Sequence, residues 1–138
     1  MESPHQLSDL QIAIMRVIWS RGEATVAEVQ NALQRERGLA NTTIATVLSR
    51  LEKRGLVTHV SRGRQYVYRA LLTEPEVRRG MITEFMERLF QGDVTEMVSS
   101  LLSSQEMGPS DLDRVKAIID EWEKEQADPE GQDEELET

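Results

Sequence analysis

The stretch from Asn41 to Val57, NTTIATVLSRLEKRGLV, decides the fold of this chain. Asn41 is a favourable N-cap and Gly55 suits the left-handed residue that follows a helix, so we expect a helix between them. Apolar residues recur at the spacing of one helical face and form its expected buried stripe: Ile44, Val47, Leu48 and Leu51. The opposite face has small or basic side chains: Thr42, Thr46, Ser49 and Lys53, flanked by Thr43 and Arg50. This division predicts a helix that packs on one side and presents hydroxyl and cationic groups on the other.

The basic side chains around this helix occur in an otherwise acidic chain. The 138 residues include 25 acidic and 16 basic side chains, which gives a net charge of −9. Residues 1–80 nevertheless hold 12 basic against 8 acidic side chains (+4), whereas residues 81–138 hold 4 against 17 (−13). Between Ala40 and Arg69, Glu52 is the only acid among six basic residues. Because charges beyond a Debye length of about 8 Å are largely screened, this local face predicts an anionic partner.

The composition limits the class of protein. Apolar residues make up 38% and aromatic residues 4%, which is low for an independent globule and typical of a helix-rich protein that buries more surface by oligomerising. The lack of cysteine excludes disulfides, thiolate metal sites and cysteine nucleophiles, and agrees with a reducing compartment. The N-terminus has no signal-peptide pattern, and no run approaches the roughly 18 apolar residues of a membrane span. We therefore expect a cytoplasmic protein without a membrane partner.

Two capping boxes predict helices upstream of this stretch. Ser8 with Gln11, and Thr25 with Glu28, have the spacing at which the paired side chains satisfy each other's backbone donors. These pairs predict helices at about residues 9–20 and 26–37. Downstream, β-prone runs at residues 56–60 and 65–69 flank a glycine-bearing turn at residues 61–64, which predicts a hairpin with two arginines at its tip. Three helices followed by a basic hairpin predict a winged helix-turn-helix domain over residues 1–72, in a protein that is mainly α with a small β-hairpin wing.

The remaining residues predict further helices that cannot bury their own apolar stripes. Thr73 with Glu76 opens a helix that should end before Gly92, a short helix follows, and Ser110 is the expected cap of a last helix. We interpret residues 73–126 as a helical dimerisation domain, because so few helices cannot enclose these side chains alone. The candidate dimer contacts are Met81, Phe85, Leu89, Val98, Leu101, Val115, Ile119 and Trp122. Residues 127–138 contain six acids and no basic residue, which predicts an acidic disordered tail.

Four segments together resemble one family of transcription factors. LSDLQIAIMRVIW, TTIATVLSRLEKRGLV, RGRQYVY and LFQGDVTEMVSSLL occur in the order found in the BlaI/MecI/CopY family of penicillinase-repressor-like proteins, over about residues 7–122. The resemblance implies a homodimer that represses antibiotic-resistance or stress-response genes. In such a dimer the winged helix binds palindromic operator DNA and the C-terminal helices interlock.

The sequence departs from the family at two places that bear on induction. The copper-sensing branch binds metal through a C-terminal cysteine cluster, and this chain has no cysteine. In the β-lactam branch a membrane sensor-linked protease triggers cleavage of the repressor, often at an Asn-Phe bond in the helix after the FxG motif. The matching bond here is Ser100-Leu101. The resemblance therefore implies a protease partner without the usual cleavage sequence.

The candidate DNA contacts follow from the predicted helix and hairpin. Short hydroxyl side chains allow a helix to approach base edges, and arginines or lysines at the periphery suit phosphates. These candidates are Asn41, Thr42, Thr43, Thr46, Arg50, Lys53, Arg54, Arg62 and Arg64. The simpler interpretation of the helix face is a solvated surface, and that of the two hairpin arginines is a solubilising turn. A rival function is a protein-interaction module in which the winged helix no longer binds DNA, although such a module does not need so many cations.

Catalysis and metal binding have little support in the sequence. The two histidines, His5 and His59, have no serine or carboxylate at a spacing typical of a catalytic arrangement. Two histidines without cysteine are also poor ligands for a transition metal. We therefore expect a protein that is not an enzyme and that needs no cofactor.

Overall fold

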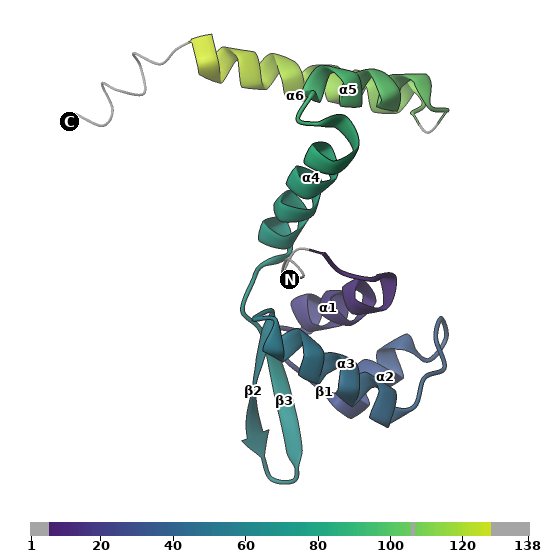
Figure 1. Ribbon diagram of the computed structural model, residues 1–138, viewed down its shortest axis with the longest axis vertical. Coiled ribbons are helices and arrows are strands. Elements are labelled where there is room, and N and C mark those ends of the chain that lie inside the picture. The colour runs from purple at the N-terminus through teal and green to yellow at the C-terminus, as the bar shows by residue number, and fades with distance from the viewer. Residues whose placement is uncertain (1–5, 106, 128–138) are drawn as a thin grey trace, which may run out of the picture. The chain divides into compact units, whose positions relative to one another are not determined.

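The computed structural model describes residues 6–105 and 107–127 of the chain (Figure 1). The chain divides into two compact units between Leu89 and Phe90. An acidic tail is predicted for residues 127–138. Of these residues the structure describes Ala127 alone, and residues 128–138 lie outside the described residues.

The first unit contains three helices, a small sheet and most of a fourth helix. Figure 1 shows the first three helices gathered beside the hairpin. The elements are α1 (Asp9–Arg21), β1 (Ala24–Thr25), α2 (Val26–Leu33), α3 (Asn41–Lys53), β2 (Val57–Arg62), β3 (Gln65–Ala70) and α4 (Glu74–Phe90). This order of helices and strands confirms the predicted winged helix-turn-helix.

Local sequence signals explain where α1 and α2 begin. The Ser8 hydroxyl accepts from the Gln11 amide at 3.2 Å while the Gln11 side chain accepts from the Ser8 amide at 2.9 Å. Thr25 and Glu28 repeat this exchange at 3.1 and 2.9 Å. Both predicted capping boxes are thus confirmed, and each satisfies two backbone donors that a helix start leaves without partners.

Two predicted helix boundaries are wrong. Asn41 is the first residue of α3, and the N-cap is Ala40, whose carbonyl accepts from the Ile44 amide at 3.2 Å and whose side chain makes no capping bond. The second helix ends at Leu33, four residues before the predicted end at Arg37. Leu33 is its last buried side chain, so the exposed residues after it have no apolar surface that would hold them in a helix.

The sheet is antiparallel with the order β1-β3-β2. Arg62 pairs with Gln65, so the hairpin loop consists of Gly63 and Arg64 alone. Gly63 has a φ of 61°, a conformation that glycine adopts without strain at the first position of a type II′ turn. The predicted hairpin is confirmed. Its first strand is longer than predicted, because Ser61 and Arg62 pair with Tyr66 and Gln65 and are not part of the turn. The two-residue strand β1, which pairs with β3, was not predicted.

One core holds the first unit together and includes α4. Its buried side chains come from α1, α2, α3 and the sheet, and Val77 of α4 is only 3% exposed within the same cluster. The Trp19 indole of α1 donates to the Leu72 carbonyl at 2.9 Å, which ties the start of α4 to α1. Met81 packs against this cluster as well. The packing of the first unit therefore continues past residue 72, where the sequence placed the end of the DNA-binding domain.

The second unit contains α5 (Val94–Ser103) and α6 (Pro109–Ala127). Asp93 caps α5 by accepting from the Glu96 amide at 3.1 Å. The expectation that Ser110 caps α6 is wrong, because the helix begins at Pro109 and the Gly108 carbonyl accepts from the Leu112 amide at 3.1 Å. Proline is favoured at a first helical position, where its missing N–H costs no hydrogen bond. Among the described residues of α5 and α6, no side chain is buried.

Candidate nucleic-acid interface

Helix α3 presents a polar face that is held in place by the core on its other side. Ile44, Leu48 and Leu51 are fully buried, so rotation of the helix about its axis would expose them. The exposed residues on the other side are Asn41, Thr42, Thr43, Thr46, Ser49, Arg50 and Lys53. None of these seven is acidic, so the face is uncharged near its N-terminus and cationic near its C-terminus.

The Thr46 hydroxyl has a defined role within this face. It donates to the Thr42 carbonyl at 2.9 Å, one helical turn earlier. A hydroxyl oxygen has one hydrogen and two lone pairs, so this bond uses the hydrogen and leaves Thr46 able to accept. The Thr46 side chain can therefore accept from a donor on a ligand while its methyl group offers an apolar contact.

Glu52, the only acid between residues 40 and 69, is paired with a histidine of the wing. The His59 Nδ1 atom lies 2.7 Å and 2.9 Å from the two carboxylate oxygens of Glu52. The His59 ring also stacks on Tyr66, with 4.2 Å between ring centroids, and lies 5.4 Å from Tyr68. This cluster joins the C-terminal turn of α3 to both strands of the hairpin.

The same cluster perturbs one titratable group. Burial raises the pKa of the Tyr68 phenol above its ordinary value, and the Glu52 carboxylate raises it further because a second negative charge nearby is unfavourable. In the hairpin register His59 lies opposite Tyr68, a pairing that strand alternation alone does not specify. Residues 52 and 59 have no spacing that predicts a contact.

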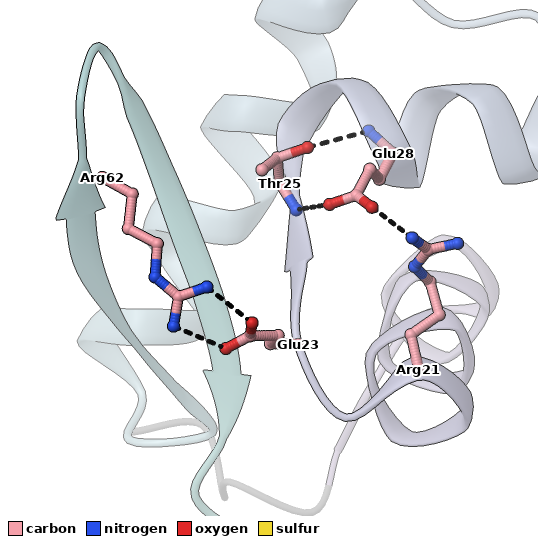
Figure 2. Close-up of polar contacts among 5 residues, drawn as sticks. All are labelled: Arg21, Glu23, Thr25, Glu28 and Arg62. Carbon is pink, nitrogen blue, oxygen red and sulfur yellow. Dashed lines mark hydrogen bonds and ion pairs between the residues drawn. The ribbon is translucent and has the colours of Figure 1, made fainter.

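Four cationic side chains are expected to contact phosphates: Lys53, Arg54, Arg62 and Arg64. Lys53 is exposed at the end of α3, and Arg64 is exposed in the hairpin loop. Arg54 instead donates to the Gln6 carbonyl and, at 3.4 Å, to the Gln11 side chain. Arg62 forms an ion pair with Glu23, at 2.7 Å and 3.3 Å between nitrogen and oxygen atoms (Figure 2). The structure therefore brings α3 and the hairpin together as expected but gives two of the four cations intrachain partners.

The candidate dimer contacts are mostly exposed in a single chain. Met81 is half-buried against the core of the first unit, whereas Phe85 and Leu89 of α4 are 49% and 61% exposed. The remaining candidates lie exposed on α5 and α6: Val98, Leu101, Val115, Ile119 and Trp122. Large apolar side chains at this exposure typically mark a surface that binds a protein partner.

Among residues 6–105 and 107–127, no group of three or more histidine, aspartate or glutamate side chains could hold a metal ion. Over those same residues, no helix has the length and apolar character needed to cross a membrane.

Comparison with known proteins assigns the family. The model of the penicillinase repressor family matches residues 7–121 of the chain. The chain belongs to the penicillinase repressor family. Its proteins are transcriptional repressors, which are not enzymes. The resemblance drawn from the four sequence segments is thus confirmed.

Two relatives and one solved structure illustrate the similarity. The penicillinase repressor of Bacillus licheniformis is 27% identical over 121 residues, covering 88% of this chain and 94% of that protein. The transcriptional regulator BlaI of Mycobacterium tuberculosis (strain CDC 1551 / Oshkosh) is 39% identical over 80 residues, covering 57% of this chain and 58% of that protein. A solution structure of the DNA-binding domain of the repressor BlaI is 33% identical with a TM-score of 0.48, covering 55% of this chain and 93% of that one.

Proposed function

We propose that the protein is a homodimeric transcriptional repressor that inserts α3 into the major groove of a palindromic operator. The observation that carries this proposal is the acid-free, exposed face of α3, which is fixed by a fully buried apolar stripe on its other side. The major groove of B-DNA is about 12 Å wide and admits one α-helix. Membership of a repressor family gives independent support.

In this proposal the helix reads bases and the cations set its register. Asn41, Thr42, Thr43 and Thr46 lie toward the N-terminal half of the exposed face, where recognition helices meet base edges. Thr46, with its hydrogen donated inward, would accept from the amino group of cytosine or adenine, and its methyl group would meet a thymine methyl. Arg50, on the same exposed face, would add to the reading of base edges. Lys53 and Arg64 would contact phosphates, which position the protein without reading sequence.

The dimer supplies the symmetry that a palindromic operator requires. The exposed apolar residues of α4, α5 and α6 would be buried between two copies of the chain. A two-fold dimer then presents two α3 helices to two half-sites related by the same two-fold axis. Such a protein works where the chromosome lies, so we place it in the cytoplasm. If a sensor-linked protease relieves repression, a cut near Ser100-Leu101 would divide α5 and weaken the dimer.

A pair of matched threonine variants tests this function. Thr46 in α3 and Thr83 in α4 are both exposed, and each hydroxyl donates at 2.9 Å to the carbonyl four residues earlier. A carboxylate on the DNA-facing helix would meet the negatively charged groove, so Thr46→Asp should lower DNA affinity by at least about 100-fold. Thr83→Asp adds the same charge away from that face and should change affinity less than about three-fold.

Fluorescence anisotropy with labelled duplex DNA measures both affinities, and thermal unfolding verifies that both variants are folded. Equal losses in the two variants would mean that charge alone, and not the α3 face, governs binding. A wild-type chain that binds no duplex DNA would favour the protein-interaction module instead.

A further inference from the structure

The Arg62 side chain of the wing is directed to a carboxylate of its own chain. Its two terminal nitrogens donate to the two oxygens of Glu23, at 2.7 Å and 3.3 Å. Figure 2 shows the side chain running along the sheet toward Glu23, away from the hairpin loop. The two residues are 39 positions apart in the sequence, and Glu23 precedes β1 while Arg62 ends β2.

The sheet order explains how they meet. Strand β3 lies between β1 and β2, and its residue Val67 pairs with Thr25 on one side and with Val60 on the other. Because β1 and β2 both run antiparallel to β3, they are parallel to each other. Glu23 lies two residues before Thr25 and Arg62 two residues after Val60, so the two residues are on opposite sides of this row. The long arginine side chain reaches the carboxylate by running back along the sheet and across β3. The short strand β1, which was not predicted, brings Glu23 into range.

A phosphate and a carboxylate compete for the same two donors. Arginine binds both anions with parallel N–H···O bonds, so Arg62 cannot hold Glu23 and a DNA phosphate in this way at once. We propose that Glu23 weakens DNA binding by this protein, because Arg62 must leave the Glu23 carboxylate before it can bind a phosphate. This inference rests on the proposed DNA-binding function. It assigns Glu23 a role in setting affinity.

The exposure of the pair supports exchange rather than a structural role. The Arg62 and Glu23 side chains are 61% and 41% exposed, so water and salt screen their attraction. Exposed pairs of this kind contribute little to folding, and their partners are easily exchanged. After exchange the released Glu23 carboxylate would remain beside the wing and repel the phosphate backbone. Both effects act in the same direction, against DNA binding.

Glu28 provides a control that is matched in charge and position. It forms an ion pair with Arg21, as Figure 2 shows, and it belongs to the capping box of α2. Hydrogen bonds from the Thr25 amide and the Thr25 hydroxyl lower the pKa of Glu28, and the neighbouring Arg21 lowers it further. Glu28→Gln removes one negative charge while the amide oxygen can still accept from the Thr25 amide. It leaves the pair of Glu23 with Arg62 intact.

The experiment is a double-mutant cycle on the full chain, read by fluorescence anisotropy with a labelled DNA duplex at about 100 mM salt. The proteins are wild type, Glu23→Gln, Arg62→Gln, the double variant and Glu28→Gln. Given the usual strength of an exposed pair, Glu23→Gln should tighten binding by about two- to five-fold per subunit. That gain should vanish when Arg62 is also glutamine, and Glu28→Gln should bind like wild type. Thermal unfolding of each variant establishes that the folded protein is being compared.

Each outcome decides the proposal. Tighter binding by Glu23→Gln that depends on Arg62 supports it. Unchanged or weaker binding by Glu23→Gln, while wild type binds DNA, overturns the role of Glu23 and leaves the proposed function in place. Equal gains from Glu23→Gln and Glu28→Gln, or a gain that persists without Arg62, would show an effect of net charge and also overturn it. A wild-type chain that binds no DNA overturns both this proposal and the proposed function.

Discussion

The His59 imidazole of the wing lies 2.7 Å from the carboxylate of Glu52 in the last turn of α3. The contact joins the proposed reading helix to the hairpin across seven residues of chain, and it also gives the only acid of the basic face a partner. The stack of His59 on Tyr66 extends the connection to the second strand of the hairpin. The orientation of the wing relative to α3 therefore depends on this cluster as well as on the buried core.

Removing His59 should destabilise the fold modestly. His59→Ala loses the hydrogen bond to Glu52 and the stack on Tyr66, and we expect the free energy of unfolding to fall by about 1 kcal/mol. Ser61→Ala changes an exposed residue on the same face of the same strand and should alter it by less than about 0.5 kcal/mol. Chemical denaturation of both variants measures the difference. Equal stability of His59→Ala and wild type would mean that the core alone fixes the wing.

Tyr68 should titrate above the ordinary tyrosine range. Its pKa is raised by burial and by the Glu52 carboxylate, so the folded state retains the phenol proton at a pH where the unfolded state has lost it. The stabilisation is fully present below the unfolded pKa of about 10 and is lost as pH rises through the higher folded value. Absorbance titration of Tyr66→Phe isolates Tyr68, since the chain has two tyrosines. A Tyr68 transition at or below pH 10 would contradict the burial argument.

Structure that depends on neighbouring residues is the most predictable from the sequence. The capping boxes at Ser8 and Thr25, and the loop at Gly63, are set by side chains a few positions apart, so their patterns identified two helix starts and the hairpin. The prediction of Asn41 as the N-cap is wrong by one residue, because Ala40 is the N-cap and makes no side-chain capping bond. Propensity alone cannot choose between adjacent residues when no side-chain bond decides the matter.

Contacts between distant residues were beyond prediction from the sequence. Arg54 donates hydrogen bonds to Gln6 and Gln11 only because α1 packs near the end of α3. Arg62 meets Glu23 only because the short strand β1 joins the sheet, and two residues are too few to show a strand pattern. The residue types on the DNA-facing surface could therefore be identified, whereas the intrachain partners that compete for them could not.

The intact chain should be a dimer that the exposed face of α6 holds together. Ile119→Asp places a charge among apolar side chains at the proposed interface, and we expect it to produce a monomer. Ala117→Asp adds the same charge to an exposed position on the opposite side of α6 and should leave the dimer intact. Light scattering at micromolar concentration distinguishes the two states. A monomeric wild-type chain would refute the proposed interface.

DNA binding should weaken steeply as salt rises, despite the net charge of −9. Each phosphate contact contributes about −0.9 to the slope of log affinity against log salt. The expected slope is about −4 if only Lys53 and Arg64 of each subunit bind phosphates. It approaches about −7 if Arg54 and Arg62 also exchange their intrachain partners for phosphates. Anisotropy across a salt series gives the slope, and a value near zero would exclude a phosphate-binding face.

Selection of bound sequences from a random pool of duplex DNA tests most directly whether two α3 helices read a palindromic operator. The full-length protein should enrich an inverted repeat whose half-site centres lie about 10–10.5 base pairs apart, or a multiple of that distance, because the dimer presents both helices to one side of the duplex. Failure to enrich any sequence, or enrichment of a single site without a symmetric partner, would contradict the proposed dimeric repressor.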